Sequence, residues 1–440
     1  MDLHRLSLSE LSRLIHAGEI SPVQLLEDLL RRIERLEPAI EAWVTLDRGG
    51  ASAAAGRLAD EAEAGRFRGP LHGIPVGVKD IFYTEGLRTT MGSPIFSGFV
   101  PSSDADVVQR LRKAGAVILG KTETTEFASS DPAPTRNPWS LEHTPGGSSS
   151  GSAAAVSSGM CPAAFGTQTG GSVIRPAAFC GVVGMKPTYD LISRRGVYPL
   201  SWTLDHVGFF TRTVEDSAIM LGALTGMGNP FSDGPHGESE PPKLGLLRGY
   251  FQENAHEDAW RGFEEAVERL GDAGVVVVEI LLPDSFDVVH AAHRVIMASE
   301  ATSVHEENFR DRRMDYRVNI RGLIASGLLV PASDYIRARR IRSRFIGEAA
   351  AMLKDVSSLL TPSAPTPALR GLGSTGNPAF NAPWSFVGFP SITVPSGLTV
   401  DGLPLGIQLV GSPLHEDKLL ADAGWCEEVL GFQKTPRDPI

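Results

Sequence analysis

The sequence is short of the features that mark secreted and metal-binding proteins. Its 440 residues include only three cysteines, Cys161, Cys180 and Cys426, which share no CxxC or metal-ligand spacing. Disulfide frameworks need more cysteines at closer spacing, so we interpret these three as reduced residues of a cytosolic protein. The eleven histidines form no HExxH or paired motif. We therefore expect neither a metal nor a cofactor.

Long apolar runs and an excess of basic charge are also missing. The N-terminus, MDLHRLSLSELSRLIHAGEISP, has no unbroken apolar core and does not match a signal peptide. The most apolar stretch, SAAAVSSGMCPAAFG, is too polar to span a bilayer. The formal net charge of −11 disfavours nucleic acid, which binds to a basic face. The sequence thus predicts a cytoplasmic protein with a small-molecule partner, no nucleic acid and no membrane, and leaves a homodimer open.

The hydrophobic patterns that are present alternate between helix and strand. Ser21 and Pro22 are typical of an N-cap and a first helical residue, and leucines recur behind them at helical spacing. We predict an N-terminal helical segment over 1–65, packed on the core. In IPVGVK, residues 74–79, apolar residues alternate as in a strand that ends at a lysine.

Helix and strand patterns continue to alternate along the rest of the chain. Repetition of this kind predicts an α/β fold, with one large mixed β-sheet flanked by helices on both faces. We see no convincing boundary within 66–440 and predict a single α/β domain there, with a helical region at about 285–350.

Three short elements are candidates for chemistry. Lys79 ends a strand in GVKDIF, a serine run follows two glycines in PGGSSSGSAAAV, and Ser172 follows two glycines in GTQTGGSVIRP. Taken singly, each has an ordinary interpretation: an exposed lysine, a helix-capping turn, and a turn or phosphate clamp. Residues 144–184 contain no Asp or Glu, and we interpret them as a tightly packed core because a flexible linker does not carry AAAV, MCPAAF and FCGVVGM.

Together the three elements resemble the amidase signature family. The stretch TPGGSSSGSAAAVSSGMCPAAFGTQTGGSVIRPAAFCGVVGMKPT, residues 144–188, is similar to that family's signature block nearly from end to end. Four further segments also resemble the family: GIPVGVKDIF, GAVILGKTETTEFA, FPSITVPSG and PLGIQLVG. The resemblance covers about residues 5–430. It implies the amidase signature fold and hydrolysis of linear amides, with carbamates or ureas as further substrates.

The resemblance also implies a catalytic relay. Ser172 would be the nucleophile, Ser148 the bridging serine preceded by a cis peptide bond, and Lys79 the terminal base. A serine hydroxyl needs such a base to accept its proton, and the chain has no GxSxG elbow for a Ser-His-Asp triad. The relay requires a neutral lysine, whose pKa must fall from an ordinary value of about 10.4; burial would lower it.

The two glycines before Ser172 then have a chemical purpose. The backbone N–H groups of Thr169, Gly170, Gly171 and Ser172 would form the oxyanion hole. A phosphate clamp is disfavoured because neither a GxxxxGK[ST] pattern nor a Rossmann fingerprint is present.

Two positions depart from the family pattern. Gln168 is neutral where many relatives carry an acid, and Arg175 stands third after the nucleophile, which is similar to the malonamidase branch. In that branch the arginine recognises a substrate carboxylate. The alternative is a structural ion pair, for example with Asp205. Gln168 and Arg175 are both candidate substrate contacts.

The rest of the substrate pocket is predicted from the parts that least resemble the family. These are the helical region at about 285–350 and loops that carry Phe127, Ser129, Ser130 and Trp384. The leading functional hypothesis is a stand-alone amidase. The alternative is the glutaminase subunit of a tRNA-dependent amidotransferase, against which the arginine-rich region 220–360 counts. A catalytically inactive binding protein is disfavoured because all three relay residues are present.

Overall fold

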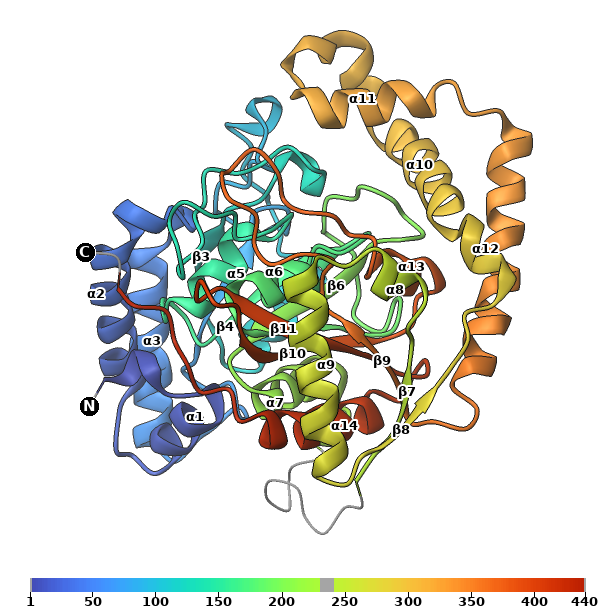
Figure 1. The fold of residues 1–440 in the computed structure, drawn as a ribbon. Helices are drawn as coiled ribbons and strands as arrows, with labels where there is room; N and C mark the ends of the chain where they lie inside the picture. The colour runs from blue at the N-terminus through green and yellow to red at the C-terminus, as the bar shows by residue number, and fades with distance from the viewer. Residues whose placement is uncertain (1, 230–240, 439–440) are drawn as a thin grey trace.

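The fold is built on one mixed β-sheet that crosses the whole molecule (Figure 1). The computed structural model describes residues 2–229 and 241–438. In this part of the chain eleven strands pair in the order β1-β3-β2-β4-β6-β5-β10-β11-β9-β7-β8. The strands are β1 (Trp43–Leu46), β2 (Pro75–Lys79), β3 (Val117–Thr122), β4 (Ala163–Gln168), β5 (Val183–Lys186), β6 (His206–Thr211), β7 (Lys243–Leu246), β8 (Val276–Glu279), β9 (Ser358–Pro362), β10 (Ser391–Leu398) and β11 (Pro404–Val410).

The strand directions are mixed. β3, β2 and β4 are parallel to one another, as are β9, β7 and β8, whereas the central strands from β4 through β6, β5, β10 and β11 to β9 are antiparallel. β1, from the predicted N-terminal segment, adds an antiparallel edge strand to β3. The predicted α/β class with a single mixed sheet is confirmed.

Helices cover both faces of the sheet. They are α1 (Leu8–His16), α2 (Pro22–Ile40), α3 (Arg48–Glu63), α4 (Asp106–Lys113), α5 (Ser150–Ser157), α6 (Ile174–Cys180), α7 (Val214–Thr225), α8 (Tyr250–Glu253), α9 (Glu257–Asp272), α10 (Val289–Arg312), α11 (Val318–Gly327), α12 (Ala332–Met352), α13 (Ala382–Val387) and α14 (Glu416–Leu430). α10, α11 and α12 extend from the sheet as a helical lobe, the amber-to-orange part of Figure 1. Each described helix is too short or too polar to cross a lipid bilayer.

The period of two along the strands divides the core into two layers. In β3, Val117 and Leu119 pack with α2, α3, α5 and α6, whereas Ile118 packs with α1, α4, α7 and α14 on the opposite face. Phe209 and Phe210 of β6 divide in the same way. Because both faces are covered, the strands at the centre of the sheet, from β3 to β9, are buried over almost their whole length.

The same alternation directs Lys79. Val76 and Val78 of β2 belong to one layer, so Gly77 and Lys79 face the other, where α5 packs. Ser148 and Ser149 immediately precede α5, and Ser172 lies just before α6. The end of one strand and the beginnings of two helices therefore supply the three predicted relay residues.

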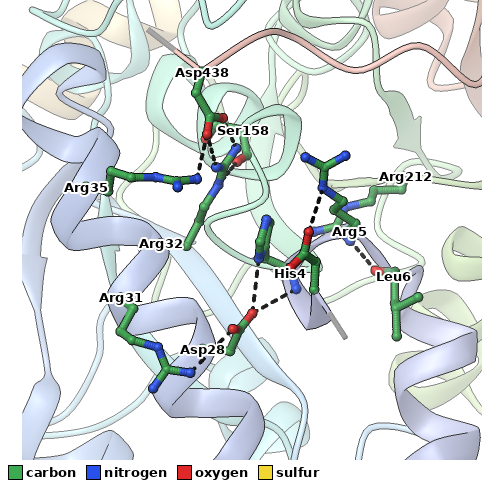
Figure 2. Close-up of polar contacts among 11 residues, drawn as sticks. His4, Arg5, Leu6, Asp28, Arg31, Arg32, Arg35, Ser158, Arg212 and Asp438 are labelled. Atoms are coloured by element: carbon green, nitrogen blue, oxygen red, sulfur yellow. Dashed lines mark hydrogen bonds and ion pairs between the residues drawn. The ribbon is translucent and has the colours of Figure 1, made fainter. Parts of the chain in front are cut away.

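Helix α2 begins at a local capping motif and is anchored by Arg32, which binds residues far away in sequence. Ser21 forms a capping box with Gln24, and Pro22 occupies the first turn, as predicted. Arg32, further along α2, donates from Nε to the carbonyl of Ser158 at the end of α5 and from Nη1 to Asp438 at 2.8 Å (Figure 2). The C-terminal segment is thus tied to α2 and, through it, to the layer that carries α5.

We expect Asp438→Asn to lower the free energy of unfolding by about 1 kcal/mol at pH 7, because a partly exposed carboxylate that bridges Arg32 and Arg35 is lost. The hydrogen bond from Arg32 lowers the pKa of Asp438. Its stabilisation is therefore present at neutral pH and disappears as the pH falls through that lowered pKa. Denaturant unfolding of both proteins between pH 2 and 7 measures the difference.

Asp401→Asn is the matched control, since Asp401 is exposed and forms no ion pair with another described residue. An equal loss of stability in the two variants, or a loss for Asp438→Asn that does not change with pH, would contradict the assigned contact.

Candidate active site

Lys79 is the centre of a cluster of hydroxyl groups. It is fully buried, and its Nζ lies 2.7 Å from Ser148 Oγ, 3.0 Å from Ser149 Oγ and 2.9 Å from Thr167 Oγ1. No carboxylate of a described residue forms an ion pair with it. The sequence pointed to Lys79 and Ser148; Ser149 and Thr167 were not singled out, although both lie beside residues that were.

Burial determines the protonation state of this lysine. Desolvation lowers the pKa of Lys79 well below its usual range, while the charge of Asp205 opposes this shift. A neutral amine has two N–H donors and one lone pair, so one of the three hydroxyls must donate to Nζ. Ser149 Oγ donates to the carbonyl of Thr167, which leaves Ser148 or Thr167 to donate to the lysine. The arrangement suits a neutral base that accepts a proton from Ser148.

Close backbone packing sets the position of Ser148. The peptide bond between Gly147 and Ser148 is cis, as the family resemblance implied. Gly146 has φ +83°, and a side chain there would meet Pro176 Cα at 2.8 Å. Arg175 donates from Nη2 to the carbonyl of Gly147 at 2.7 Å. The segment before α5 is therefore held directly against the segment that follows Ser172.

Gln168 anchors the backbone that follows Ser172. Its Oε1 accepts hydrogen bonds from the N–H groups of Val173 and Ile174, at 2.9 and 3.0 Å, and so caps the beginning of α6. Its Nε2 donates to Ser385 Oγ at 3.1 Å. The amide oxygen thus binds the backbone and the amide nitrogen binds Ser385, so Gln168 anchors the loop between β4 and α6.

The two glycines before Ser172 have ordinary backbone conformations, because neither has a φ in the left-handed region. The reason for glycine at Gly171 is space: an added Cβ would lie 2.6 Å from Asn381 Oδ1. At Gly170 the nearest atoms would be 3.5 Å away, in Pro378. The N–H groups of Gly170, Gly171 and Ser172 donate to no other described residue, so they are free to bind a ligand oxygen.

Arg175 is buried and bound to backbone rather than to an acid. Besides the Gly147 carbonyl, its Nη2 contacts Thr375 Oγ1 at 3.3 Å. The ion pair with Asp205 that the sequence suggested is not formed, because Asp205 accepts from Thr169 and from two backbone N–H groups. Burial lowers the pKa of Arg175 to about 10, and its Nε and Nη1 have no partner among the described residues.

The other predicted substrate contacts lie mainly in packed regions. Phe127 packs against the rings of Phe96, Tyr198, His305 and Tyr316. Trp384 is buried in the apolar cluster under the helical lobe. Ser129 is half-buried and Ser130 exposed, and their carbonyls accept hydrogen bonds from Thr125 and Asn319. Their roles toward a substrate stay predictions.

A cavity of about 410 Å³ lies beside the relay. It includes Thr167, which contacts Lys79, and Thr169, the first predicted oxyanion residue. Its other polar lining residues are Asp190, Ser193, Arg194, Arg195, Tyr198, Trp202, Asp205 and His206. Sequence reasoning missed most of these because no short motif marks the segment 190–206. In the described ranges no group of three or more His, Cys, Asp or Glu side chains is arranged to bind a metal ion.

Comparison with known proteins shows the family. A model of the Amidase family matches residues 24–420. One subunit of the glutamyl-tRNA(Gln) amidotransferase of Geobacter metallireducens is 36% identical over 98% of this chain and 99% of its own, and the corresponding subunit of Halothermothrix orenii is 34% identical over the full length of both. The chain belongs to the amidase family, and it is an enzyme that acts on carbon–nitrogen bonds by amide hydrolysis.

Solved structures share the whole fold. The native peptide amidase from Stenotrophomonas maltophilia is 30% identical, with a TM-score of 0.85 over 99% of both chains. A structure described as an unexpected vestigial protein complex, which reveals the evolutionary origins of an s-triazine catabolic enzyme, is 30% identical, with a TM-score of 0.87 over 99% of this chain and 100% of that one.

The relatives correct our expectation about partners. The sequence predicted a small-molecule substrate and no nucleic acid, with a homodimer left open, whereas the relatives are subunits of an enzyme named for a tRNA-bound amino acid. The prediction was wrong because it used the net charge of −11 as if the chain bound its partners alone. In a multi-subunit enzyme, other chains can supply the basic surface.

We expect Arg175→Ala to lower the melting temperature by a few degrees and kcat/KM by about tenfold on every amide, since the Gly147 carbonyl loses a buried charge-assisted hydrogen bond. The measurement is kcat/KM for an amide that bears a carboxylate and for its neutral methyl ester. A drop confined to the acid-bearing amide, without loss of stability, would instead assign Arg175 to carboxylate recognition. Arg337→Ala, on an exposed face of α12, is the control.

Proposed function

We propose that this chain is the amide-hydrolysing subunit of an amidotransferase-type assembly, which releases ammonia from glutamine through an acyl-enzyme on Ser172. The observation that carries the chemistry is the 2.7 Å contact between the buried amine of Lys79 and Ser148 Oγ. A buried, neutral lysine in contact with a serine is what a relay from the nucleophile requires.

In the first step Ser172 Oγ attacks the amide carbon, and its proton passes to Ser148 as the Ser148 proton passes to Lys79 Nζ. The carbonyl oxygen becomes negative and is bound by the N–H groups of the segment from Thr169 to Ser172. The relay then runs in reverse: Lys79 returns a proton through Ser148 to the leaving nitrogen, and ammonia departs. Water attacks the acyl-enzyme with the same base, which regenerates Ser172 and releases the acid.

Two findings support a role within an assembly rather than as an isolated enzyme. The relatives named as amidotransferase subunits match over 98% and 100% of this chain, so the similarity is not confined to the signature block. A solved relative of similar fold was found in a protein complex. Cleavage of carbamate or urea bonds and a cytoplasmic location stay predictions.

The experiment is an assay of ammonia release from glutamine, from a neutral linear amide and from a carbamate. It is carried out with the chain alone and with the remaining amidotransferase subunits from the same organism. We expect glutamine to be the best substrate and the added subunits to raise kcat/KM at least tenfold. Rapid cleavage of the neutral amide or the carbamate, with no response to added subunits, would favour the stand-alone amidase.

The relay makes a prediction about pH. We expect kcat/KM to fall as the pH falls through the lowered pKa of Lys79, because the relay needs the neutral amine and protonation removes the base. Above that pKa the rate should reach a plateau. Ser172→Ala and Lys79→Ala should each reduce turnover by at least a thousandfold while the protein remains folded.

Lys113→Ala is the control, because Lys113 is an exposed lysine at the end of α4. Substantial turnover by Ser172→Ala, or an unchanged acid limb in a Lys79→Ala protein that keeps its activity, would refute the relay.

A further inference from the structure

The predicted oxyanion segment is Thr169–Ser172, and the carbonyl group that precedes each of its four N–H groups accepts a hydrogen bond from a residue outside the segment. The four contacts are Gln168 O to His206 Nδ1 at 3.2 Å, Thr169 O to His293 Nε2 at 2.9 Å, Gly170 O to Ser385 Oγ at 2.8 Å, and Gly171 O to the N–H of Arg175 at 3.1 Å. In a trans peptide the C=O and the next N–H point in opposite directions. Each of these hydrogen bonds therefore points the N–H of the next residue away from the group that binds the carbonyl.

His293 is the partner from the helical lobe. It belongs to α10 and is 6% exposed. A carbonyl oxygen can only accept, so Nε2 must carry the hydrogen. The ring lies beside Gly170, where an added Cβ would be 3.8 Å from His293 Cε1. Burial lowers the pKa of His293 to about 4, so the ring stays neutral and adds no charge near the reaction.

Ser385 holds the next peptide. It is fully buried at the centre of α13, donates to the Gly170 carbonyl and accepts from Gln168 Nε2. Since Gln168 also caps α6, Ser385 links the oxyanion segment to the helix that follows the nucleophile.

Two adjacent glycines make these outside contacts necessary. Gly170 and Gly171 have no side chains to restrict the rotation of their peptide planes, so the segment has little conformational preference of its own. Without a donor contact on its carbonyl, the Thr169–Gly170 peptide has no hydrogen bond that distinguishes the catalytic orientation from the flipped one.

We propose that His293 and Ser385 are positioning residues of the oxyanion hole: by binding the carbonyls of Thr169 and Gly170, they direct the N–H groups of Gly170 and Gly171 toward the substrate oxygen. The inference rests on the proposed function, because it takes Ser172 as the nucleophile. Neither side chain touches the reacting atoms. Each acts through the backbone.

The test compares His293→Ala, His293→Gln and Ser385→Ala with the unmodified chain. Loss of one oxyanion donor typically costs about 10²–10³ in rate, so a donor that is present but poorly directed should cost at least tenfold in kcat. We expect KM to change less than threefold in His293→Ala and Ser385→Ala. His293→Gln, whose amide can donate to the same carbonyl, should recover most of kcat.

A second measurement separates positioning from general structural damage. A trifluoromethyl ketone analogue of the best amide forms a tetrahedral adduct with an oxyanion, whereas an unreactive ketomethylene analogue does not. We expect His293→Ala and Ser385→Ala to weaken inhibition by the trifluoromethyl ketone at least tenfold and to leave the unreactive analogue nearly unaffected. Equal weakening for both inhibitors, or a kcat within twofold of the unmodified chain, would overturn the proposal.

His290→Ala is the matched control, because His290 lies one turn earlier in α10 and packs on Tyr250 without contacting the oxyanion segment. If His293→Ala does not fold, Ser385→Ala carries the test alone. Ser172→Ala keeps the two proposals distinct. An active Ser172→Ala protein refutes the proposed function, whereas an inactive Ser172→Ala with a fully active His293→Ala refutes this inference alone.

Discussion

The burial of a single amine governs the organisation of this site. Placing a lysine in a protein interior is costly while it is charged, and the protein responds by lowering its pKa. Around Lys79 the neighbours are hydroxyls from Ser148, Ser149 and Thr167, which can bond a neutral amine without stabilising the charged form as a carboxylate would. The small residues of the signature block allow this packing. At Gly166, for example, an added Cβ would lie 2.6 Å from Ser149 Oγ.

The second constraint is backbone orientation. Gly170 and Gly171 have no side chains, so the orientation of the N–H groups in the segment 169–172 depends on the groups that bind the preceding carbonyls. In this chain those partners come from β6, α10 and α13, as well as from α6 itself. The segment 168–172 is short, but α10 and α13, which lie more than 100 residues away in sequence, bind two of its carbonyl groups.

Much of the fold, and the contact between Lys79 and Ser148, could be predicted from the sequence because the signals are local. Apolar alternation in residues 74–79 marked β2, Ser21 and Pro22 marked the start of α2, and the signature block carried the family resemblance. The contacts of His293 and Ser385 could not be predicted in this way, because they depend on how α10 and α13 pack and no motif surrounds either residue. Arg175 illustrates the same limit: the sequence offered an acid as its partner, and the structure uses the Gly147 carbonyl. The prediction about partners was wrong because total charge says nothing about which chain of an assembly contacts nucleic acid.

The hydrogen bond from His293 of α10 to the Thr169 carbonyl connects the helical lobe to the segment that precedes Ser172. The lobe is the part of the chain whose sequence resembled the family least. Yet the position of His293 in α10 determines whether this hydrogen bond can form. An insertion that shifts the register of α10 by one residue would move His293 away from the Thr169 carbonyl, whereas a substitution elsewhere in α10 would leave that hydrogen bond in place.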